Sequence, residues 1–173
     1  LKDRVVLWTR VIPGDGFDRG LDVEWQVAVD KGFAKVTSSG HFFTDASRDF
    51  TVKVDASSLE PGRQYFYRFI SKGEVSPTGV TRTLPVGEVA RFRIGIASCS
   101  NYPQGFFNAY RDMASQDLDA VVHLGDYIYE YPDGGYANKE ALERLNRHVR
   151  PAHETLTLED YRTRYGVYRT DQD

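Results

Sequence analysis

Two apolar segments separated by an amphipathic one constrain the fold of this chain more than any other feature. Residues 92–98 and 119–124 read as strands, and residues 105–116 between them have the apolar spacing of a helix. This order gives a βαβ unit, in which the strands are parallel and the crossover is right-handed in nearly all known cases. Both loops that follow the strands are therefore expected to leave the same edge of the sheet.

Three side chains that can bind metal ions follow these strands. Cys99 comes directly after the first strand, Asp126 lies two residues past the second, and Tyr129 lies three residues further on. Open α/β sheets bind their ligands outside the carboxyl ends of the strands. A thiol, a carboxylate and a phenol at that edge predict a metal site, where a bound ion would deprotonate the thiol.

Each of the three has a structural alternative. A lone cysteine such as Cys99 often serves as a small core residue, and Asp126 could cap a turn or a helix. The spacing of Tyr127, Tyr129 and Tyr131 favours an aromatic pocket wall over a ligand role for Tyr129. The residues alone leave these alternatives open.

Composition excludes several classes of protein. The net charge is −3, with no basic stripe that would indicate specific nucleic-acid recognition. No apolar run approaches the roughly 20 residues of a membrane-spanning helix. The single cysteine cannot form an internal disulfide. Oligomeric state leaves no signature in the sequence.

The first half of the chain reads as short strands separated by turns. Alternating apolar and polar residues predict strands at 5–11, 23–29, 35–43, 50–54 and 65–70, and Gly and Pro mark turns, for example at 13–16. The pattern predicts an antiparallel β-sandwich over residues 1–86, and residues 84–88 are the expected linker. The second domain is expected to cover residues 91–173.

One segment of the first half resembles the corner of a fibronectin type III-like sandwich. Residues 59–68, LEPGRQYFYR, place a Tyr-x-Tyr strand after Leu-x-Pro-Gly. A tyrosine ring there would pack on the core while its hydroxyl bonds to nearby backbone. The alternative is an ordinary strand after a Pro-Gly turn.

The second half contains three predicted helices. The first should bury Phe106, Phe107, Tyr110, Met113 and Ala114; the second, at 139–147, should turn Ala141, Leu142 and Leu145 inward. The third, at 157–168, should begin at Thr157 with Asp160 completing a capping box. A two-stranded parallel sheet does not finish a domain, so we expect a longer protein with an unpaired sheet edge here.

The remaining charged candidates are less specific. His123 lies inside a strand and is expected to be a satisfied core residue, whereas His148 and His153 are expected in solvated loops. Guanidinium groups suit phosphate, but most of the arginines in the helical part are expected on a solvated face: Arg144, Arg147, Arg150, Arg162 and Arg164.

Together these pieces resemble the alkaline phosphatase D (PhoD-like) family of metallophosphatases. The matching segments are VLWTR (6–10), ASCS (97–100), GFFNAY (105–110), HLGDYIYEY (123–131) and TLEDYRTRY (157–165). The resemblance implies an αββα calcineurin-like core in the second domain, of which this chain holds the first part. It also implies that Cys99 and Tyr129 are metal ligands, that Asp126 bridges two ions, and that the ions are iron(III) and calcium.

The implied activity is hydrolysis of phosphate esters, as an alkaline phosphatase or phosphodiesterase, by a metal-activated water or oxo group. Further ligands are expected beyond Asp173, so residues 1–173 alone should be nearly inactive. The implied location is secreted, periplasmic or cell-envelope, with an export signal upstream of Leu1. One alternative is a fibronectin-like binding module with a non-catalytic α/β appendage. Another is a hydrolase with Cys99 as nucleophile, although no histidine is evidently placed as its base.

Overall fold

The computed structural model describes residues 1–14 and 19–173. The chain forms two compact units, Leu1–Ala90 and Arg91–Asp173. The predicted turn at 13–16 lies partly outside the described residues. No helix in the described ranges is long and apolar enough to cross a membrane.

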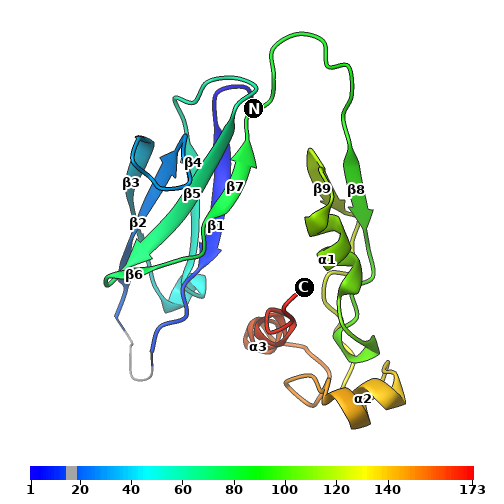
Figure 1. The fold of residues 1–173 in the computed structure, drawn as a ribbon. Helices are drawn as coiled ribbons and strands as arrows, with labels where there is room; N and C mark the ends of the chain where they lie inside the picture. Colours follow the sequence, from blue (N-terminus) through cyan, green and yellow to red (C-terminus); the bar gives the residue numbers. More distant parts are fainter. Residues whose placement is uncertain (15–18) are drawn as a thin grey trace. The chain divides into compact units, whose positions relative to one another are not determined.

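The first unit consists of two antiparallel sheets (Figure 1). In one, β1 (Val5–Arg10) pairs with β4 (Thr51–Ala56), which follows a short 3₁₀ helix, η1 (Ala46–Arg48). The other has the order β3 (Val36–Thr44), β2 (Leu21–Ala28), β5 (Gln64–Ser71) and β6 (Glu74–Val75), with β7 (Gly79–Arg82) also paired to β5. The five strands expected from alternation are confirmed, and β6 and β7 are additions.

Both sheets contribute to one hydrophobic core. Inward-facing residues alternate with outward-facing ones in the core strands, so that Val23 and Val27 of β2 and Val52 of β4 have no exposed surface. Tyr65 on the central strand β5 is also fully buried, and its hydroxyl accepts a hydrogen bond from the Glu60 backbone N–H at 2.8 Å. The expected tyrosine corner contact is therefore present.

The second unit begins with the βαβ element. β8 (Ile94–Ala97) and β9 (Ala120–His123) pair in parallel, with Ala97 opposite His123, as predicted. A 3₁₀ turn, η2 (Tyr102–Gln104), precedes the crossover helix α1 (Asn108–Ser115), which runs alongside the two strands (Figure 1). The expected helix therefore starts later than residue 105.

The predicted apolar face of the crossover helix is only partly correct. Ala114 is exposed rather than buried, and Phe106 precedes α1 and is 52% exposed. Its ring lies 4.9 Å from the Arg147 guanidinium. A phenylalanine outside the helix does not follow the helical spacing, which explains the error.

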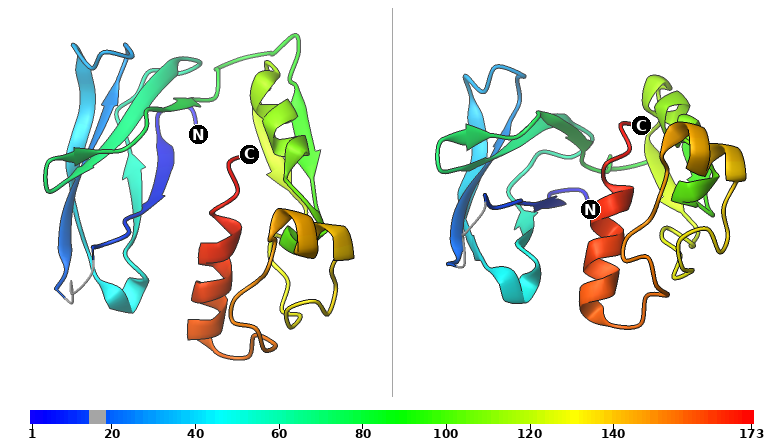
Figure 2. Two further views of the ribbon diagram at one scale, coloured as in Figure 1. Left: turned by 60° about the horizontal axis from the view of Figure 1, so that its bottom comes forward. Right: turned by 90° about the horizontal axis from the view of Figure 1, so that it is seen from below.

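Two further helices complete the second unit (Figure 2). In α2 (Lys139–Leu145) Ala141 is buried, but Leu145 is 44% exposed, so its predicted inward orientation is wrong. The helix ends at Leu145, and the chain departs from helical phase at Asn146, which has a left-handed φ of 51°. In α3 (Leu158–Tyr168) the predicted capping box of Thr157 and Asp160 is confirmed.

Candidate metal centre

The loops after β8 and β9 are joined by their backbones. Leu124 N–H donates to Ala97 O at 2.8 Å, continuing the pairing of the strands. Beyond it, Cys99 N–H donates to Gly125 O at 3.1 Å and Ser100 N–H donates to Asp126 O at 2.9 Å. These bonds hold the two loops against each other at the carboxyl edge of the sheet.

The same two loops contain backbone in the left-handed region. Cys99 has φ 58° and Asp126 has φ 53°. Gly125, which directly precedes Asp126, also has a positive φ of 129°. A left-handed cysteine is uncommon, and such conformations persist at functional sites when the surrounding bonds hold them. Here both strained residues are those predicted to bind metal.

The three predicted ligands converge on one oxygen atom. The Cys99 thiol donates to Asp126 Oδ2 at 3.6 Å, and the Tyr129 hydroxyl donates to the same oxygen at 3.4 Å. Cys99 and Asp126 are exposed, and Tyr129 is half-buried. The structure thus brings together side chains that are separated by up to 30 residues along the chain.

The donor set fits a metal ion. Among the described residues, no three His, Cys, Asp or Glu side chains form a group that could hold an ion. The cluster therefore depends on the phenol of Tyr129 as its third donor. Thiolate and phenolate suit a transition metal such as iron, and carboxylate oxygen suits both iron and calcium.

The Tyr129 phenol is held in its neutral form by its surroundings. Burial of the ring, together with its hydrogen-bonded neighbours Cys99 and Asp126, raises the pKa of Tyr129 above its ordinary value. A phenolate ligand at this position consequently requires a cation to stabilise its charge.

The aromatic wall and the ligand cluster share Tyr129. Its ring lies 6.1 Å from that of Tyr131, nearly parallel to it, and 5.8 Å from that of Tyr136. Tyr127 instead has its ring 5.2 Å from His123 and 6.2 Å from Tyr165. The expected row of three tyrosines is therefore split, because Tyr127 turns toward β9 and α3.

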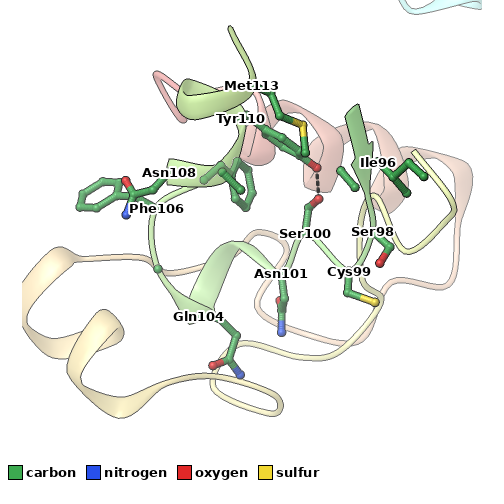
Figure 3. Close-up of a pocket in the computed structure, with 14 residues that line it drawn as sticks. Ile96, Ser98, Cys99, Ser100, Asn101, Gln104, Phe106, Asn108, Tyr110 and Met113 are labelled. Carbon is green, nitrogen blue, oxygen red and sulfur yellow. Dashed lines mark hydrogen bonds between the residues drawn. The ribbon is translucent and has the colours of Figure 1, made fainter. Parts of the chain in front are cut away.

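A pocket adjoins one side of the cluster. It has a volume of about 420 Å³ and lies between the loop after β8 and the start of α1 (Figure 3). Cys99 contributes to its lining, whereas Asp126 and Tyr129 do not. In Figure 3 Tyr110 points toward Ser100, while Phe106 and Cys99 project in opposite directions.

The other histidine candidates lie outside the cluster. His123 is half-buried and hydrogen-bonded to Ser100 and Gly125, so it is satisfied as expected. His148 is exposed and contacts Asp133 at 2.7 Å, and His153 is exposed and contacts Asp160 at 3.1 Å. The expectation of solvated loop histidines is confirmed for both.

Two arginines expected on a solvated face are buried. Arg147 pairs with Asp171 at 2.6 Å and lies 3.5 Å above the Tyr102 ring. Arg164 is 1% exposed and donates to three backbone carbonyls, those of Tyr129, Arg150 and Pro151. The expectation of a solvated face is wrong for Arg147 and Arg164, because each guanidinium contacts groups of the protein in place of water.

The contact of Arg164 with the predicted site is the feature that sequence reasoning missed. Its bond to the Tyr129 carbonyl fixes the backbone of a predicted ligand. Position on α3 gave no indication of this role, because Arg162 and Arg164 look equivalent in sequence. The pairing of α3 with the loop at 129–131 arises only in three dimensions.

Comparison with known proteins places this chain in a class of phosphatases. The chain matches the PhoD-like phosphatase N-terminal domain over residues 1–85 and the PhoD-like phosphatase domain over residues 94–173. The chain therefore belongs to the PhoD-like phosphatase family.

Two relatives place the chain within that family. It is 41% identical to alkaline phosphatase D of Bacillus subtilis (strain 168) over 178 aligned residues, covering 99% of this chain and 30% of the relative. A solved structure described as "Structure of PhoD" matches with a TM-score of 0.91 and 40% identity, covering 99% of this chain and 34% of that chain. The chain thus spans about a third of the length of these relatives.

Proposed function

We propose that the intact protein is a metal-dependent phosphoesterase, and that Cys99, Asp126 and Tyr129 form part of its metal site. The observation that supports this proposal most directly is that the Cys99 thiol and the Tyr129 phenol both contact Asp126 Oδ2. A pure binding module has no need of three metal-capable side chains at one sheet edge, two of them on left-handed backbone. This argument favours the enzyme over the fibronectin-like adhesion module.

Each of the three residues has a distinct role in the proposal. The Asp126 carboxylate would bridge two ions, and Cys99 and Tyr129, which both contact its Oδ2, would add a softer and a harder donor. Bound iron and calcium would supply charge that neutralises the phosphate and lowers the pKa of water. The hydrogen-bonded backbones of the two loops keep the donors in place without rearrangement.

Three finer features also belong to the proposal. The first unit is a fibronectin type III-like sandwich, supported by its two sheets, common core and tyrosine corner. The second unit is the first part of an αββα domain, supported by the parallel pair β8 and β9 and the helix α1. An exported location follows from the resemblance to the family.

Cys99→Ser in the intact protein tests the metal site. Serine keeps the size of the side chain but is a poor ligand at neutral pH, so bound iron and its visible absorption should be lost. Metal analysis and the absorption spectrum of the purified variant measure this. Ser98→Ala, one residue earlier and also exposed, is the control. Full iron occupancy in Cys99→Ser would remove Cys99 from the site.

Residues 1–173 expressed alone should hydrolyse phosphate esters at no more than a trace of the rate of the intact protein. A two-ion site needs more donors than the three that converge here. Hydrolysis of a phosphodiester and a phosphomonoester by equal molar amounts of the two proteins measures the difference. Comparable metal-dependent rates would show that the site is complete within this stretch.

A further inference from the structure

The His123 ring connects the two loops that carry the predicted ligands. His123 is the last residue of β9, and its Nε2 lies 2.9 Å from Ser100 Oγ. Its Nδ1 accepts a hydrogen bond from the Gly125 backbone N–H at 3.3 Å. Ser100 and Gly125 are the direct sequence neighbours of Cys99 and Asp126. The imidazole therefore contacts each loop one residue away from a ligand.

The hydrogen bonds fix the tautomer of this histidine. A backbone N–H can only donate, so Nδ1 must accept from Gly125 and the ring proton must be on Nε2. Nε2–H then donates to Ser100 Oγ, which leaves the serine hydroxyl free to donate to the Tyr110 hydroxyl. The three hydrogen bonds thus form a chain with a single donor direction, from the Gly125 N–H to His123, from His123 to Ser100, and from Ser100 to Tyr110 on α1.

Two aromatic rings hold the imidazole in this orientation. Tyr127 meets it edge-on with ring centres 5.2 Å apart, and Tyr110 does so at 6.3 Å. These contacts come from the loop after β9 and from α1. His123 thus has one defined position, with both nitrogens engaged.

The left-handed backbone explains why such a connection is needed. Cys99 and Asp126 both adopt positive φ, a conformation that costs free energy and persists only where neighbouring bonds enforce it. Two backbone bonds join the loops directly. The imidazole adds a side-chain connection to Ser100 and Gly125, the residues whose positions orient the strained pair.

We infer that His123 is a positioning residue of the metal centre, which sets the geometry of Cys99 and Asp126 by bridging Ser100 and Gly125. The expected effect of His123 on metal affinity rests on the proposed function. The bridge consists of protein atoms alone, so it can be tested separately from metal binding.

Three substitutions of His123 in the intact protein separate the two arms of the bridge. In His123→Asn the amide oxygen takes the place of Nδ1 and can still accept from Gly125. In His123→Gln the amide nitrogen reaches the place of Nε2 and can still donate to Ser100. His123→Phe keeps the ring and loses both bonds. His148→Phe, which removes an exposed histidine bonded to a carboxylate, is the control.

The first measurement is the iron and calcium content per chain after equilibration with graded concentrations of each salt. We expect His123→Phe to weaken metal binding by about 10–100-fold, the usual effect of losing a residue that orients ligands. The asparagine and glutamine variants should recover part of the affinity, and His148→Phe should match the wild type.

The second measurement is the alkylation rate of Cys99 in metal-free protein, followed by mass spectrometry of the peptide that contains it. The rate should rise several-fold in His123→Phe and less in the two amide variants. This readout reports the loop geometry even if the protein binds no metal. Metal-free wild type that cannot be loaded would contradict the proposed function, while a changed alkylation rate would still support the bridge.

The inference is overturned if metal affinity and Cys99 alkylation in His123→Phe stay within twofold of the wild type. It is also overturned if all three variants lose metal in proportion to a fall in melting temperature, with no recovery by asparagine or glutamine. That pattern would indicate a role in stability alone. Should His123→Phe fail to fold, the two amide variants decide between these outcomes.

Discussion

Asp126→Asn is expected to reduce phosphate-ester hydrolysis by the intact protein by more than about 100-fold, beyond the loss typical of residues that only orient ligands. Its Oδ2 is the atom on which the Cys99 thiol and the Tyr129 hydroxyl converge. Asparagine preserves the shape of the side chain but removes its charge and one of its two anionic oxygens. The variant should hold both ions more weakly, because a neutral amide offers one oxygen acceptor in place of a negatively charged carboxylate.

The measurement is kcat/KM for a phosphodiester and a phosphomonoester, together with metal content. Asp112→Asn, an exposed carboxylate on α1, is the matched control and should retain full activity. Asp126 has a left-handed φ of 53°, which asparagine also tolerates, so the variant should keep its fold. Activity above a tenth of the wild type, with metal retained, would exclude Asp126 as a bridging ligand.

The strand pattern made much of the architecture predictable from the sequence. Alternation located the strands of the first unit because each buries one face, as Val23 and Val27 do. The order strand, helix, strand located β8 and β9 because parallel strands need a crossover. The same rule brought Cys99 and Asp126 together, since both follow the carboxyl ends of paired strands.

The sequence could not predict interactions that depend on how loops fold back. The resemblance to the family, and not the spacing, predicted Tyr129 as a ligand, and its contact with Asp126 depends on the conformation of the loop that joins them. Phe106 lies just before α1, and Leu145 is the last residue of α2. Helical periodicity predicted both side chains to be buried, but each is exposed at the end of its helix. Arg147 and Arg164 are buried cations, and charge alone predicts exposure.

Arg164→Met should lower the free energy of unfolding by about 3–5 kcal/mol, because three carbonyls lose their partner and each such loss costs at least about 1 kcal/mol. Arg164 Nε and Nη2 each donate at 3.0 Å, to the carbonyls of Arg150 and Pro151, and Nη1 donates to the carbonyl of Tyr129. Methionine fills similar space but offers no donor, so all three carbonyls lose their bond. Equilibrium urea unfolding, followed by circular dichroism, measures the change.

Arg164→Lys and Arg144→Met show whether the several N–H donors of the Arg164 guanidinium are responsible for the loss of stability. Lysine keeps the charge but presents its donors from a single nitrogen, so it should recover only part of the stability. Arg144 is 75% exposed and paired with Glu140 on α2, and its loss should change stability by no more than about 0.5 kcal/mol. A loss in Arg164→Met as small as that in Arg144→Met would show that the carbonyl bonds contribute little. A large loss accompanied by weaker metal binding would tie α3 to the metal centre, because the carbonyl of Tyr129 is one of the three that Arg164 holds.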